Sequence, residues 1–255
     1  MQCNRDDVFF DYRIECSEAK EVSNMKTIGI IGGMSFESTV SYYQIINREV
    51  NQRLGGFHSA KILLYSVDFF EIEECQASGN WEKAGQLLAE AAVKLESAGA
   101  DFIVIATNTM HKVAPFVQSQ IHIPLLHIAE AIASAIKNQE LQKTLLLGTK
   151  YTMIQNFYKD KLLQQGLEVL IPNEQDIELI NRVIFQELCS GIIDDQSRKE
   201  FQRIIESLRQ EGAESVILGC TEIGLLIQQD NSTLPVFDST EIHAKAAVEF
   251  ALELS

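Results

Sequence analysis

The sequence predicts an α/β fold of two pseudo-symmetric, doubly wound lobes, each with a parallel sheet, and an active-site cleft between them. The first observation behind this is an internal repeat. Residues 99–109 (GADFIVIATNT) and 212–222 (GAESVILGCTE) both begin Gly-Ala-acid, run through an apolar strand and end in small polar residues. The second is an alternation of strand and helix patterns along both halves of the chain. Ligands of such sheets bind at the carboxyl ends of strands, where Thr107 and Cys220 occupy equivalent positions.

The first half begins with an apolar strand at 26–31, followed by Gly32-Gly33-Met34-Ser35 and a helix from Phe36 to about Gln52. Ser35 is a good helix cap, and a glycine turn before a helix leaves backbone donors free for an anion. The same residues also fit a plain tight turn without a ligand. The other elements expected are strands at 61–67, 102–106 and 123–128, a loop or short helix at 68–79, and helices at 81–98, 111–120 (interrupted near Pro115) and 129–137.

The second half repeats this order. Gly166 and Gly191 follow two of its helices, as is common at helix ends. The expected strands are 143–149, 167–171, the strand that leads to Cys220, and 234–238. The expected helices are 152–165, 176–190, 195–210 and 241–254.

The domain boundaries follow from this order. Residues 1–24 are polar and acidic and lack the basic start and apolar stretch of a secretory signal, so we expect an extension that precedes the fold. The first lobe is expected at 25–125 together with 239–255, because the last helix should pack back on it. The second lobe is expected at 126–238.

The amino-acid composition argues against several classes of function. Hydrophobic residues make up 46% of the 255 residues, and no apolar run approaches the roughly 20 residues of a membrane span. The net charge of −15 argues against nucleic acid or an anionic membrane as partner. The five cysteines lack Cys-x-x-Cys spacing and the five histidines form no metal-type pair, so we expect free thiols in a reducing cytoplasm and no metal site.

The candidate catalytic and binding residues follow the two repeated strands, at 107–109 and at 220–222; we call these two segments the tips. Cys220 fits a base or nucleophile with a lowered pKa, although free cysteines usually just pack in the core. Thr107, Asn108 and Thr109 fit a carboxylate site, a helix cap, or both. His111 is expected either to orient the tip or to be a structural histidine. Cys75 and Cys189 are expected to be packing residues.

Three motifs together resemble the aspartate/glutamate racemase family: IIGGMS at 30–35, NTMH at 108–111 and GCTEI at 219–223. The resemblance runs from about residue 25 to the end. It implies racemisation of aspartate or glutamate by two opposed acid/base residues without a cofactor, with a small amino acid as partner; the family often forms homodimers. Most members carry a cysteine in both motifs, whereas an enterobacterial L-aspartate/glutamate-specific branch resembles this chain in carrying threonine in the first.

The resemblance also implies residue roles. Cys220 and Thr107 are the expected catalytic pair, and the expected substrate-binding residues are Met34, Gln76, Asn108, Thr109 and Thr221. Some aspartate racemases hold the side-chain carboxylate with an arginine and a lysine, and Gln76 and Cys189 align with those positions here.

The expected pair is chemically unequal. A thiol has a pKa of about 8.5 and forms a thiolate readily, whereas a threonine hydroxyl is far too weak an acid to serve as a standing base. We therefore expect Cys220 to take the α-proton of the L-enantiomer and Thr107 to donate a proton on the opposite face. Single-cysteine decarboxylases and isomerases of the same superfamily, a hydantoin racemase, and a non-catalytic amino-acid-binding protein remain alternatives.

Overall fold

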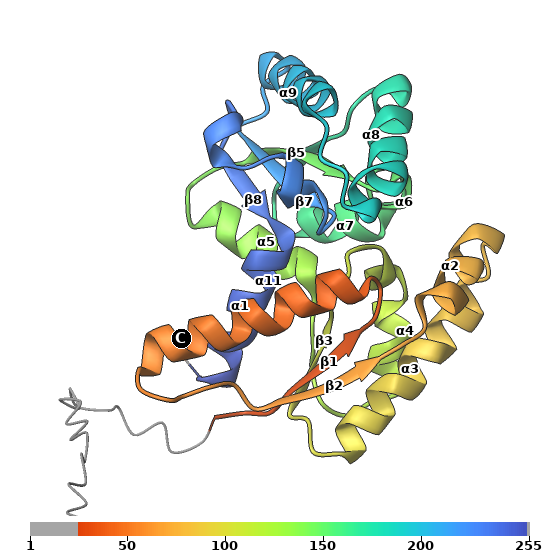
Figure 1. The fold of residues 1–255 in the computed structure, drawn as a ribbon, viewed down its shortest axis with the longest axis vertical. Helices are drawn as coiled ribbons and strands as arrows, with labels where there is room; N and C mark the ends of the chain where they lie inside the picture. The colour runs from red at the N-terminus through yellow and green to blue at the C-terminus, as the bar shows by residue number, and fades with distance from the viewer. Residues whose placement is uncertain (1–24, 254–255) are drawn as a thin grey trace, which may run out of the picture.

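The computed structural model describes residues 25–253, and the expected extension at 1–24 lies outside them. Two four-stranded parallel sheets form the centres of two lobes, as the sequence predicts. Figure 1 shows one lobe around β1, β2 and β3 and the other around β5, β7 and β8, with α11 returning from the second lobe to lie beside α1. Within residues 25–253, no helix is both long and apolar enough to cross a bilayer.

The two sheets have the same strand order. The first is arranged β2 (Ile62–Ser66), β1 (Ile28–Gly32), β3 (Phe102–Ile105), β4 (Leu125–Leu126), and the second β6 (Glu168–Leu170), β5 (Lys143–Gly148), β7 (Ser215–Gly219), β8 (Val236–Asp238). The repeated strands, β3 and β7, thus have equivalent places. Each lies beside the first strand of its own lobe.

Helices cover both faces of each sheet. In chain order they are α1 (Phe36–Leu54), α2 (Phe69–Ser78), α3 (Trp81–Ser97), η1 (Thr109–Val113), α4 (Ala114–Ser119), α5 (Ile128–Lys137), α6 (Lys150–Ile154), α7 (Asn156–Gln164), α8 (Glu174–Gln186), η2 (Leu188–Ser190), α9 (Asp195–Gln210), α10 (Ile223–Leu226), η3 (Gln229–Asn231) and α11 (Ser239–Ala251).

Alternate side chains of each strand enter different cores. In β3, Ile103 and Ile105 face the core under α3, while Phe102 and Val104 face the core shared with α1 and α11. In β7, Val216 and Leu218 pack with Phe201 of α9, and the intervening side chain faces α5. This explains why the strands read as continuous apolar runs: both faces are buried.

Several predicted elements differ in extent. The helix expected at 152–165 is two helices, because Gln155 is extended (φ −77°, ψ 150°) and Lys159 Nζ donates to the Ile154 carbonyl at 2.9 Å. The strand expected at 123–128 shrinks to Leu125–Leu126. Two other expected helices contain 3₁₀ turns, at η1 and η2. The last helix begins at Ser239, since Asp238 caps it by accepting from the N–H groups of Thr240 and Glu241.

Candidate active site

A cavity of about 700 Å³ lies where the carboxyl ends of the two central sheets meet. Its lining includes every residue that the sequence singles out for the site: Met34, Gln76, Thr107, Asn108, Thr109, Cys220 and Thr221. Both copies of the repeat therefore contribute their tips to one cavity. The expected cleft is present, and it takes residues from both lobes.

The loop after β1 places Met34 in the cavity. Gly33 has φ +92°, and a Cβ atom there would lie 2.2 Å from the Val67 carbonyl oxygen, so only glycine fits. Its N–H donates to Thr39 Oγ1 at 2.8 Å. Ser35 caps α1 by accepting from the Ser38 N–H at 3.3 Å. The turn thus has a structural cause and also forms one wall of the site.

His111 holds the tip that carries Thr107. Its Nε2 accepts from the Ile128 N–H at 3.2 Å, so Nδ1 carries the proton and donates to the Thr107 carbonyl at 2.8 Å. Burial, followed by the neighbouring His127 and His243, keeps the His111 pKa well below its usual value. The ring is neutral and fixed in one tautomer, which favours the orienting role over the purely structural one.

Asn108 and Thr109 connect this tip to the second lobe. Asn108 Nδ2 donates to Ser239 Oγ at 2.9 Å, and Ser239 Oγ donates to the Leu218 carbonyl of β7. The hydroxyls of Thr109 and Thr149 lie 3.2 Å apart. Asn108 Oδ1 is buried and has no hydrogen-bond partner among the described residues. A buried acceptor without a donor is unusual and marks a place for a ligand group.

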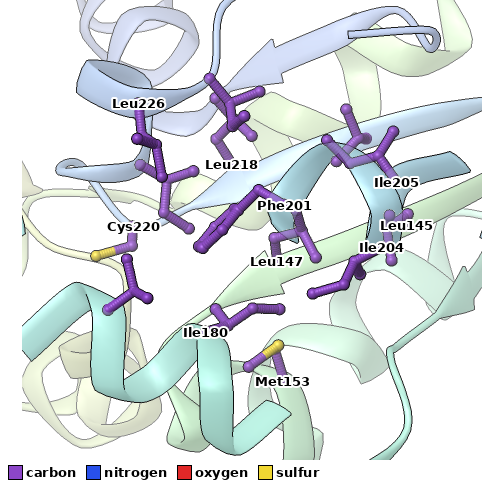
Figure 2. Packing of buried hydrophobic residues seen from close by; sticks show 14 of the residues in the cluster. Leu145, Leu147, Met153, Ile180, Phe201, Ile204, Ile205, Leu218, Cys220 and Leu226 are labelled. Carbon is purple, nitrogen blue, oxygen red and sulfur yellow. The ribbon is translucent and has the colours of Figure 1, made fainter. Parts of the chain in front are cut away.

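Cys220 follows β7 and borders the apolar core of the second lobe. Figure 2 shows its sulfur directed away from Phe201. Sγ donates to Glu222 Oε2 at 3.0 Å. Burial and the Glu222 carboxylate raise the pKa of the thiol well above its usual value. The expected lowering of this pKa is therefore wrong: the surroundings of the Cys220 thiol raise it.

Glu222 is the site residue that the sequence reasoning missed. Besides Cys220, it accepts from Thr221 Oγ1 at 2.6 Å on Oε2 and from Ser35 Oγ at 3.3 Å on Oε1. Its position two residues after Cys220 was the one indication in the sequence that Glu222 could lie near the thiol. The spacing alone does not predict that the Glu222 side chain turns back toward Cys220.

Cys189 also differs from expectation. It was expected to be a packing residue, but it is exposed and lines the cavity, whereas Cys75 is buried as expected. Partial burial of its thiol group, followed by the nearby Glu222 carboxylate, raises the Cys189 pKa to about 11.

The charges of the lining are all negative. Glu37 and Glu222 line the cavity, and no lysine, arginine or histidine does so among the described residues. The chain from 25 to 253 also has no cluster of three histidine, cysteine, aspartate or glutamate side chains suited to a metal ion. The polar groups of the site are therefore two thiols, hydroxyls, amides and two carboxylates.

Comparisons with known proteins agree with this fold. A family model described as Asp/Glu/Hydantoin racemase matches residues 31–247. A Yersinia pestis structure, provisionally assigned as an Asp/Glu racemase, is 53% identical with a TM-score of 0.86 and covers 89% of this chain and 100% of that one. An aspartate racemase homologue from Pyrococcus horikoshii is 40% identical with a TM-score of 0.79, covering 89% and 99%. A broad-specificity amino-acid racemase from Bacillus subtilis is 26% identical over 87% of this chain and 96% of its own.

Proposed function

The chain belongs to the Asp/Glu/hydantoin racemase family, and we propose that it racemises an α-amino acid directly, with Cys220 and Thr107 acting on opposite faces of the α-carbon. One observation carries the proposal: the equivalent tips of the two repeats, one ending in a thiol and the other in a hydroxyl, line the same cavity. Racemisation needs two proton-transfer groups that approach the α-carbon from opposite sides. The equivalent tips of the duplicated fold are our candidates for this pair.

Glu222 supplies the first proton transfer. The Cys220 thiol proton passes along the 3.0 Å hydrogen bond to Oε2, which leaves a thiolate and a neutral carboxyl group. The thiolate then removes the α-proton of the L-enantiomer and becomes a thiol again. This order of proton transfers is compatible with the raised pKa of the Cys220 thiol, because the thiolate that acts as the base forms only during turnover.

The carbanion needs donors around the α-carboxylate, since negative charge moves onto that group as the α-proton leaves. We assign them to the Thr109 hydroxyl and to backbone N–H groups at the start of η1, which lack partners inside the helix. The buried and unpartnered Asn108 Oδ1 suits the α-ammonium group. These contacts would fix the α-carbon between the two tips.

Thr107 completes the reaction. Its hydroxyl donates a proton to the opposite face of the carbanion and regains one from water, while Glu222 returns its extra proton to solvent. Because a threonine hydroxyl is not a standing base, the same path starting from the D-enantiomer should be slow. The proposed enzyme therefore prefers L-amino acids.

Direct proton transfer also fits the residue types present. A pyridoxal Schiff base requires a lysine amine, and the described lining contains none. Aspartate and glutamate are the substrates that the family resemblance implies. The relatives include both an aspartate racemase homologue and a broad-specificity amino-acid racemase, so the choice of side chain depends on the cavity itself.

Chiral chromatography of products tests the proposal. Wild-type protein is incubated with individual L-amino acids, aspartate and glutamate included, and the D-product is measured against Cys220→Ser. We expect D-product from the wild type and none from the variant. Turnover of an arylmalonate or of maleate without any D-amino acid would instead support a single-cysteine decarboxylase or isomerase. Stabilisation by an amino acid without turnover would support a binding protein.

A further inference from the structure

The sequence contains a single tryptophan, and it lies where the two lobes meet. Trp81 begins α3 of the first lobe. The ring of Tyr151, on α6 of the second lobe, packs edge-on against it, with the ring centroids 5.7 Å apart. The ammonium group of Lys112 in η1 lies over the Trp81 ring, 3.8 Å from its centroid. Trp81 therefore contacts two elements, α6 and η1, that border the cavity.

Tyr151 also reaches the first lobe with its hydroxyl group. The hydroxyl donates to the Gln76 carbonyl at 3.3 Å. This carbonyl lies in the last turn of α2, where helix carbonyls lack the usual N–H partner inside the helix. The neighbouring Thr149 hydroxyl lies 3.2 Å from that of Thr109 in η1. One segment of the second lobe, 149–151, thus contacts two residues of the first lobe that line the cavity.

The Gln76 side chain is the part of this arrangement that faces a substrate. It is 8% exposed and lines the cavity. Its Nε2 donates to the sulfur of Met110 at 3.2 Å, and a thioether is a weak acceptor. An oxygen atom of a substrate would be a better acceptor for this amide. The direction of the amide depends on its backbone, which Tyr151 holds.

We propose that Tyr151 is a positioning residue of the site: its hydroxyl holds the Gln76 backbone from the opposite lobe, so that the Gln76 amide can donate to a substrate between the two tips. This inference rests on the proposed racemase function. Tyr151 acts through Gln76, since it is not itself among the residues that line the cavity. Gln76 belongs to neither tip, so we expect its contact with the substrate to be equal before and during proton transfer. Loss of the Tyr151 hydroxyl should then weaken binding without slowing the proton transfers.

Tyr151→Phe keeps the ring beside Trp81 and removes only the hydroxyl. Chiral analysis of the D-product gives kcat and KM for the L-amino acid that the wild type turns over fastest. We expect KM to rise at least fivefold in the variant and kcat to stay within twofold. Tyr65→Phe is the matched control: it removes a hydroxyl that accepts from Lys94 outside the cavity and should change neither constant. An unchanged KM in Tyr151→Phe overturns the inference and leaves the racemase function standing.

A double variant separates positioning from a general structural effect. Gln76→Ala removes the amide but keeps the backbone carbonyl that Tyr151 contacts. Adding Tyr151→Phe to this variant should raise KM less than twofold further, because no amide is left to position. A second rise of fivefold would show that Tyr151 acts by another route, and it would overturn the inference.

Trp81 provides a measurement that needs no turnover. Because it is the one tryptophan, the emission of the protein reports the surroundings of its ring, Tyr151 and Lys112 included. If the wild type forms no D-product, its emission and that of Tyr151→Phe are titrated with L-aspartate and with L-glutamate. A saturable change whose dissociation constant is at least fivefold higher in the variant supports the positioning role, although the racemase proposal has then failed. Equal dissociation constants, or no change in emission with either amino acid, overturn the positioning role as well.

Discussion

The thiol of Cys220 donates a 3.0 Å hydrogen bond to the carboxylate of Glu222. Burial, followed by this contact, makes the thiol a poor acid, and the same contact gives the thiol proton an acceptor. Glu222 is exposed enough to line the cavity, yet three side chains donate to it, which fixes its position. We expect both the reactivity and the pH dependence of the site to follow from this pair.

Glu222→Gln should reduce the L-exchange rate about 10²- to 10³-fold, as expected when a general base is lost. Because the negative charge that raises the Cys220 pKa is also removed, alkylation of Cys220 by iodoacetamide should begin at a lower pH than in the wild type. The pH profile of alkylation separates this from a merely structural effect. Glu71→Gln, an exposed substitution on α2, serves as control and should leave both profiles unchanged.

Thr107→Val keeps the shape of the side chain and removes its hydroxyl. We expect this variant to exchange the α-proton of L-amino acids through Cys220 while forming at least tenfold less D-product. Deuterium incorporation and chiral analysis of the same reaction measure both quantities. Equal loss of exchange and of D-product would contradict the separate roles of the two tips.

Thr107→Cys places a second thiol at the equivalent tip. It should raise exchange from the D-enantiomer at least tenfold, because a thiolate can take a proton where a threonine hydroxyl cannot. The Thr107→Ser variant, which keeps a hydroxyl, is the matched control. An unchanged D-rate in Thr107→Cys would count against the assignment of this face.

His111→Gln tests the hydrogen bond through which the His111 ring positions Thr107. The ring holds the Thr107 carbonyl, so its loss should lower D-product formation at least tenfold while L-exchange through Cys220 persists. A merely destabilising substitution would lower both. Circular dichroism at the assay temperature confirms that the variant is folded.

The buried histidines His111, His127 and His243 lie in contact with one another behind Thr107, and they predict that the folded protein loses stability in acid. Burial lowers the pKa of both His127 and His243 to about 4. In the unfolded chain these rings take up protons below about pH 6.5, whereas the folded protein resists protonation until about pH 4. Stability is therefore complete above pH 6.5 and falls as the pH drops toward 4, by roughly 3 kcal/mol for a fully buried histidine. Urea unfolding at pH 7 and pH 5 measures this, and His243→Gln should reduce the difference.

Much of this arrangement could be read from the sequence because the chain repeats itself. The common ending of residues 99–109 and 212–222 predicted that Thr107 and Cys220 meet at one cavity, and their strands occupy equivalent places. Apolar runs at 102–105 and 215–219 predicted strands buried on both faces. These features depend on local pattern and on the order of elements.

The details that failed depend on tertiary contacts. At the break, Lys159 donates to the carbonyl of Ile154, and the periodicity of the sequence does not predict that bond. The raised pKa of Cys220 comes from burial and from the rotamer of Glu222, neither of which follows from the spacing of two residues. Cys189 lines the cavity only because η2 brings it beside the second tip.

The most direct test of the unequal pair is α-proton exchange of the two enantiomers of one amino acid by the wild-type protein in D₂O. Aspartate and glutamate are each supplied as pure L and pure D forms, and the initial rate of deuterium incorporation is measured by NMR. We predict that the L-enantiomer of the preferred substrate exchanges at least tenfold faster than the D-enantiomer. Equal rates from both enantiomers would contradict it, because Thr107 would then be as good a base as Cys220.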